Sequence, residues 1–128
     1  MGDVYTAPTP AQSHPSVLCA DNSPGILEIC KTILQADGYQ VFTVGTGAAA
    51  LEFLKLHTVN VAIIDDSMSD IEGIELARQI KLRDNAAIVV MFCNNLLEYE
   101  KIPSVDAFLS KGNGPIALRK LIATLLQR

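Results

Sequence analysis

The sequence predicts a doubly wound α/β domain, in which helices cover both faces of one parallel β-sheet. Short apolar runs alternate five times with segments whose apolar residues recur at helical spacing. Three of the runs, at residues 16–20, 59–64 and 87–92, lack the alternation of apolar and polar residues that marks a strand with one solvent-exposed face. Such strands are buried on both sides, which is typical of parallel sheets.

The predicted elements follow one another in regular order along the chain. The predicted strands are residues 16–20, 40–44, 59–64, 87–92 and 105–109, and the predicted helices are 24–37, 48–57, 71–83, 95–101 and 115–127. Ser23 is the expected N-cap of the first helix, Pro24 its first residue, and Gly38 its stop. Because crossovers between parallel strands are right-handed, the carboxyl ends of all strands share one edge, where we expect any chemistry.

Length and composition narrow the class of protein. The 128 residues fit one domain, which we place at 16–128 after a flexible, proline-rich tail at 1–15. A formal charge of −4 gives no basic surface for nucleic acid, and no apolar stretch is long enough to span a membrane. The three cysteines lie in apolar runs as free thiols, which favours a reducing, cytoplasmic location.

Polar residues gather where the predicted strands end, and they suggest phosphoryl-transfer chemistry. They are Asp21, Asn22, Asp65, Asp66, Cys93, Asn94, Ser110 and Lys111. In a doubly wound sheet the first and third strands are neighbours, so Asp21 and Asp65 should meet and could share Mg²⁺. Lys111 across the pocket would hold an anion against the metal. Each residue alone is an ordinary turn, cap or surface residue, and only the combination favours a site.

Three segments resemble receiver domains of bacterial response regulators, the CheY-like family. They are VLCADNSPGILEI (17–29), VNVAIIDDSMSDIEGIEL (59–76) and DAFLSKG (106–112). The resemblance implies a flavodoxin-like sheet with strand order 2-1-3-4-5. It also includes the glycine eight positions after the acceptor aspartate, here Gly73.

The resemblance also implies a role for each site residue. Asp65 would be the phosphoacceptor, attacking a phosphohistidine or a small phosphodonor. Asp21 would bind Mg²⁺ through water, and the backbone carbonyl of Ser67 would be a direct ligand. Lys111 would pair with the acceptor and later with the phosphoryl group, and the rotamer of Phe108 would report the state of the site.

Four features depart from the family pattern. Asn22 stands at a position that usually carries a second metal-binding carboxylate, so Mg²⁺ should bind weakly. Cys93 stands at the position of a Thr or Ser whose hydroxyl binds the phosphoryl group, and a thiol is a poor donor. Gly112 replaces a proline. Cys93 and Lys111 are also closer in sequence than usual, which predicts a shortened fourth helix.

We therefore expect a stand-alone receiver, not an enzyme, which takes a phosphoryl group from a sensor histidine kinase or phosphotransfer protein and signals to a protein partner. The alternative is a pseudo-receiver, a binding module that works without phosphorylation. A third, distant alternative is a small flavin- or nucleotide-binding enzyme on a flavodoxin-like sheet. It is based on the glycine-containing segment at 43–47, which we interpret as a turn and N-cap. Cys93 as a catalytic nucleophile is disfavoured, since no histidine lies nearby to activate it.

Overall fold

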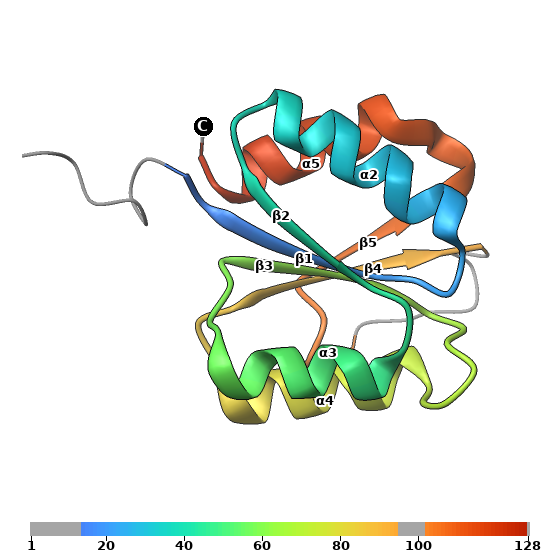
Figure 1. Cartoon of the computed structure of the whole chain (residues 1–128), viewed down its shortest axis with the longest axis vertical. Helices are drawn as coiled ribbons and strands as arrows, with labels where there is room; N and C mark the ends of the chain where they lie inside the picture. The colour runs from blue at the N-terminus through green and yellow to red at the C-terminus, as the bar shows by residue number, and fades with distance from the viewer. Residues whose placement is uncertain (1–13, 95–101, 128) are drawn as a thin grey trace, which may run out of the picture.

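A computed structural model describes residues 14–94 and 102–127, and its centre is a five-stranded parallel sheet (Figure 1). The strands are β1 (Ser16–Ala20), β2 (Gln40–Val44), β3 (Val61–Asp65), β4 (Ile88–Cys93) and β5 (Ala107–Ser110). Their order across the sheet is β2-β1-β3-β4-β5, and every pairing is parallel. The predicted doubly wound topology is therefore confirmed.

Helices cover both faces of this sheet. They are α2 (Pro24–Ala36), α3 (Gly47–Leu56), α4 (Gly73–Arg83) and α5 (Gly114–Leu125), with a short 3₁₀ turn, η2 (Lys111–Asn113), before α5. Figure 1 shows α2 and α5 on one face and α3 and α4 on the other. Within the described ranges, no helix combines the length and apolarity that crossing a bilayer requires.

Several predicted boundaries were wrong by one or two residues. The strands predicted at 59–64, 87–92 and 105–109 begin later, and each ends one residue later, so Asp65, Cys93 and Ser110 are strand residues. The helix predicted from residue 71 begins at Gly73, because residues 66–72 form a loop held by tertiary hydrogen bonds. The predicted helix at 95–101 and tail residues 1–13 lie outside the described part of the chain.

Strand alternation divides the interior into two cores. Leu18, Ala62 and Ile64 point into the core beneath α3 and α4. Cys19 and Ile63 point into the core beneath α2 and α5. All five residues of β3 are buried, as expected for a central strand with helices on both sides.

Local signals set the ends of α2 within one residue of the prediction, whereas the helices predicted at 48–57 and 115–127 lie at Gly47–Leu56 and Gly114–Leu125. The Ser23 hydroxyl accepts a hydrogen bond from the Ile26 backbone N–H at 3.4 Å, which caps α2. Gly38 follows α2 with a φ of +92°, a left-handed conformation that glycine adopts without steric cost. These caps fix where α2 starts and stops, and hence where the loop after β1 carries Asp21.

Candidate functional site

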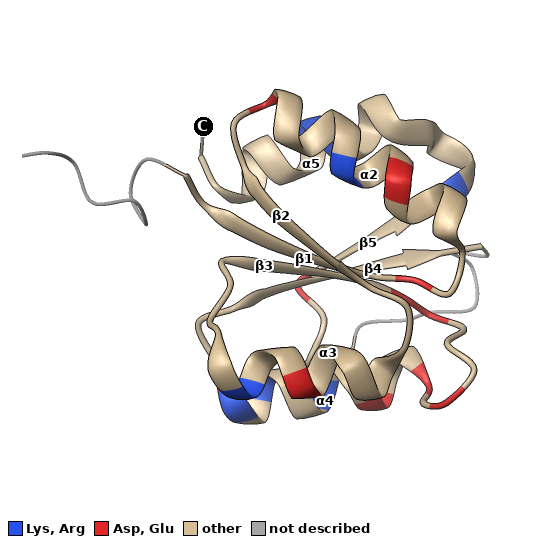
Figure 2. Ribbon diagram, viewed as in Figure 1, with Lys and Arg blue, Asp and Glu red and all other residues tan. Residues whose placement is uncertain are grey.

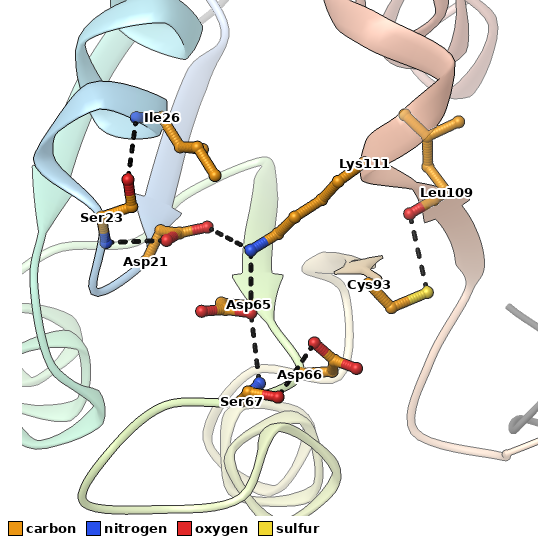
Figure 3. Close-up of polar contacts among 9 residues, drawn as sticks. All are labelled: Asp21, Ser23, Ile26, Asp65, Asp66, Ser67, Cys93, Leu109 and Lys111. Atoms are coloured by element: carbon orange, nitrogen blue, oxygen red, sulfur yellow. Dashed lines mark hydrogen bonds and ion pairs between the residues drawn. The ribbon is translucent and has the colours of Figure 1, made fainter. Parts of the chain in front are cut away.

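Three charged side chains from distant parts of the sequence meet at the carboxyl edge of the sheet. Asp65 ends β3, Asp21 follows the neighbouring strand β1, and Lys111 opens η2 directly after β5. The Lys111 ammonium Nζ lies 3.1 Å from Asp21 Oδ2 and 3.1 Å from Asp65 Oδ1 (Figure 3). The strand order thus brings together the three residues that the sequence placed at one edge.

Burial strengthens the interactions between the charges of this cluster, because little water screens them. Asp21 is 3% exposed and Asp65 2%, and no other charged residue in the described ranges is buried to that extent. Burial lowers the pKa of Lys111, but its hydrogen bonds to Asp21 and Asp65 outweigh that effect and raise the pKa above its ordinary value. Lys111 therefore stays an ammonium at neutral pH.

Short backbone turns hold both carboxylates in place. Asp65 Oδ1 accepts a hydrogen bond from the Ser67 N–H at 3.1 Å, and Asp21 Oδ1 accepts one from the Ser23 N–H at 2.9 Å. Aspartates after a strand commonly bond the backbone two residues on in this way. Because the Ser67 and Lys111 bonds both end on Oδ1 of Asp65, its other oxygen, Oδ2, points away from the lysine (Figure 3).

The loop that follows Asp65 is fastened to α3 by Asp70. Its carboxylate accepts hydrogen bonds from the backbone N–H groups of Gly47, at 3.0 Å, and Ala48, at 2.9 Å. These bonds to Ala48 and Gly47 lower the pKa of Asp70. Nothing in the sequence around Asp70 distinguishes it from an ordinary turn aspartate.

Asp70 also settles how the glycine segment at 43–47 is used. The Thr46 side chain caps α3 by accepting from the Ala49 N–H at 3.0 Å, as predicted. The backbone N–H groups of Gly47 and Ala48, at the start of α3, already donate to the Asp70 carboxylate. This disfavours the binding of a flavin phosphate at that position. A Cβ on Gly47 would lie 1.9 Å from Ile71 Cγ2, so this glycine permits the close approach of the loop.

The oxygen donors of the site fit Mg²⁺. Asp21 Oδ2 is buried, and its neighbour is the Lys111 ammonium at 3.1 Å. Two buried carboxylates at the ends of adjacent strands suit a hard, oxygen-binding cation. In the described chain no three His, Cys, Asp or Glu residues group closely enough to hold a metal, and Asn22 is exposed. Water, the Asn22 amide or the Ser67 carbonyl would have to complete the coordination.

Asp66 is turned away from this cluster. Its Oδ1 accepts a hydrogen bond from the Ser67 hydroxyl at 3.4 Å, and Figure 3 shows it on the far side of Asp65 from Asp21. Figure 2 shows the wider distribution, in which acidic residues collect where β1 and β3 end and along the loop before α4. The edge is therefore acidic, with Lys111 as the cation between the two buried carboxylates.

Cys93 and Phe108 lie on the β4–β5 side of the site. Cys93 is fully buried and its thiol donates a long hydrogen bond, 3.6 Å, to the Leu109 carbonyl. Figure 3 shows the sulfur directed at β5 and not at Asp65. Phe108 is half-buried and packs against the core beneath α3 and α4. The Lys111–Gly112 peptide bond is trans.

Comparison with known proteins agrees with this geometry. Residues 17–123 match the family model for the response regulator receiver domain. The response regulator GtcR of Aneurinibacillus migulanus is 26% identical over 117 residues, which are 88% of this chain and 48% of GtcR. This chain thus spans about half the length of that relative.

Solved structures share the fold at lower identity. The chemotaxis response regulator CheY4 of Vibrio cholerae superposes with a TM-score of 0.80 at 23% identity, covering 88% of this chain and 98% of CheY4. The response regulator TrrA of Thermotoga maritima, in complex with Mg²⁺-BeF, gives 0.80 at 24% identity, covering 87% and 98%. TrrA in complex with the histidine kinase ThkA gives 0.79 at 24% identity, covering 88% and 98%.

Proposed function

Because this chain belongs to the family of response regulator receiver domains, we propose that it relays a two-component signal by accepting a phosphoryl group on Asp65. The observation that carries the proposal is the cluster at the strand ends, where Lys111 Nζ lies 3.1 Å from both Asp65 Oδ1 and Asp21 Oδ2. A buried carboxylate paired with a fixed ammonium is a nucleophile next to a ready-made anion site. The surface lysines and aspartates of an ordinary loop have no such arrangement.

In the proposed reaction a carboxylate oxygen of Asp65 attacks phosphorus. Oδ2 is the suited atom, since Oδ1 is occupied by the Ser67 N–H and Lys111. The bond from phosphorus to the donor imidazole nitrogen breaks, the imidazole leaves, and Asp65 becomes an acyl phosphate. The Lys111 ammonium then binds a phosphoryl oxygen, which stabilises the charge that has moved onto the edge.

Mg²⁺ is the cofactor that we propose for this step. Receiver domains bind it at the phosphorylation site, and TrrA was solved with Mg²⁺-BeF. Here Asp21 and Asp65 would hold it, with the Ser67 carbonyl and Asn22 as further oxygen donors. When bound, Mg²⁺ neutralises phosphoryl oxygens. Asn22 contributes no negative charge, so we propose an affinity below that of a site with three carboxylates.

The proposed partners are a histidine kinase or phosphotransfer protein on the input side and a protein on the output side. The complex of TrrA with ThkA supports a kinase partner, since TrrA shares this fold. Action as a stand-alone receiver stays a prediction, because GtcR is about twice as long as the matched segment.

A pseudo-receiver is the second candidate, and one contact favours it. The Cys93 thiol bonds to the Leu109 carbonyl at 3.6 Å, so the position that would bind the phosphoryl group by a hydroxyl is engaged elsewhere. A domain that lost this readout while keeping its fold could act as a constitutive binding module. The two candidates differ in whether Asp65 is phosphorylated at all.

Labelling with acetyl phosphate and Mg²⁺ tests the proposal. We expect an acid-stable, base-labile acyl phosphate on Asp65 in the wild type and none in Asp65→Asn, because an amide is not a nucleophile here. Asp66→Asn is the matched control, one residue away but turned toward the Ser67 hydroxyl, and it should keep the label. A wild type without label would favour the pseudo-receiver, and label retained in Asp65→Asn would remove Asp65 from its role.

A further inference from the structure

An aromatic ring, that of Phe92, lies beside the acceptor aspartate and close to the ammonium of Lys111. Phe92 in β4 is the register partner of Asp65 in β3. Register partners in neighbouring strands point to the same face of a sheet, and Phe92 points into the core beneath α2 and α5. The Lys111 Nζ lies over the Phe92 ring, 5.7 Å from its centroid. The ring is therefore a further neighbour of the ammonium, in addition to the two carboxylates.

The geometry and burial of this contact suit a cation–π interaction. A cation within about 6 Å of a ring centroid is attracted by the negative face of the ring, and more strongly where water is excluded. Phe92 is 6% exposed and the Lys111 side chain 15%. Because the ring packs in the core beneath α2 and α5, it is a fixed support for the ammonium.

Packing alone does not fix the Lys111 side chain. Lys111 borders a cavity of about 110 Å³, which Phe92, Pro115 and Leu118 also line. A side chain next to an unfilled space lacks contact atoms on that side, and lysine has a long, flexible stem. The position of the ammonium therefore depends on the groups that its charge meets, and Figure 3 shows Lys111 reaching across the sheet edge to Asp21 and Asp65.

One of the two carboxylate contacts must change during phosphoryl transfer. Lys111 bonds to Asp65 Oδ1 before the reaction and would bind a phosphoryl oxygen after it. The Phe92 ring carries no net charge and takes no part in the chemistry, so its contact with the ammonium can persist throughout. We propose that Phe92 is a positioning residue, whose ring keeps the Lys111 ammonium beside the acceptor while its oxygen partner changes. This inference rests on the proposed phosphorylation of Asp65.

Graded fluorination of the ring tests this role. Replacing Phe92 by mono-, di- and pentafluorinated phenylalanine withdraws electrons from the ring face in steps, with little change of shape. We expect the rate of labelling by acetyl phosphate and Mg²⁺ to fall in that order, by about three- to tenfold at the last step. Phe92→Leu should lower the rate to a similar extent. The same analogues at Phe53, which packs on Phe42 on the other face of the sheet, are the matched control and should leave the rate unchanged.

Side-chain NMR of Lys111 gives a readout that does not depend on phosphorylation. Because protons over the face of an aromatic ring are shielded, the Lys111 Hε signal should lie upfield in the wild type and move downfield in Phe92→Leu. The same Hε position in both proteins would overturn the placement of the ammonium over the ring.

The labelling rates decide the role in the reaction. Equal rates throughout the fluorinated series would overturn the positioning role, since a merely structural ring would be insensitive to its electrons. A wild type without label but with a shifted Lys111 signal would contradict the proposed phosphorylation, and with it the role of Phe92, although the ring would still hold the ammonium. The two failures are therefore distinguishable.

Discussion

The site has two halves, and they differ in how completely they are assembled. In the β1–β3 half, which we call the acceptor half, Asp21 and Asp65 are buried and hydrogen-bonded to the backbone, and each lies 3.1 Å from the Lys111 ammonium. In the β4–β5 half, which we call the readout side, the Cys93 thiol donates a hydrogen bond to the Leu109 carbonyl. A phosphoryl group can shift a conformational equilibrium only if it binds one state better than the other. The contrast predicts a domain that performs the chemistry well and reads it out poorly.

The largest effect should come from removing the cation that joins the two carboxylates. Lys111→Met leaves two buried aspartates facing each other, which should lower the free energy of unfolding by about 3 kcal/mol. Mg²⁺ should restore part of the loss, because a divalent cation relieves the repulsion between the two carboxylates. Urea denaturation with and without Mg²⁺ measures this. A variant as stable as the wild type in metal-free neutral buffer would show that the acceptor half does not depend on Lys111.

A smaller effect should follow from crowding the loop of the acceptor half. A Cβ on Gly73 would lie 2.7 Å from Asp66 Cα and 2.8 Å from the Asp65 carbonyl oxygen, so the backbone at the acceptor must move. Gly73→Ala should cost about 2 kcal/mol of stability and slow labelling by acetyl phosphate. Gly45→Ala is the matched control, because a Cβ there meets nothing within 4 Å. Equal stability of the two variants would mean that this loop adapts freely.

A negative charge at position 22 should have two modest effects of opposite sign, one on Mg²⁺ affinity and one on the stability of the metal-free protein. Asn22→Asp should tighten Mg²⁺ binding about three- to tenfold, because a third carboxylate joins the site. Without metal it should destabilise the fold by less than about 1 kcal/mol through repulsion at an exposed position. Thermal unfolding across a Mg²⁺ titration reports both effects, since a ligand of the native state raises apparent stability. Unchanged affinity would show that residue 22 does not face the ion.

The acceptor half was predictable from sequence because strand order alone determines it. Uninterrupted apolar runs located β1 and β3, and parallel pairing then placed Asp21 beside Asp65. The hydrogen bonds that fasten the Asp70 loop to α3 were not predictable, because the backbone N–H partners of Asp70 lie more than twenty residues away in the sequence. The rotamer of Cys93 was not predictable either, since it depends on the Leu109 carbonyl of the neighbouring strand.

The most direct test of the contrast between the halves is a pair of amide NMR spectra with Mg²⁺, recorded before and after adding beryllofluoride. We predict large shifts at Asp21 and Ser67, which border the acceptor, and small shifts from Val105 to Phe108 on the readout side. In Cys93→Thr, the shifts at Phe108 should be larger, because a hydroxyl is a better hydrogen-bond donor than a thiol. Shifts at Phe108 in the wild type as large as those at Ser67 would contradict the account, because the thiol would then couple the two halves as a hydroxyl does.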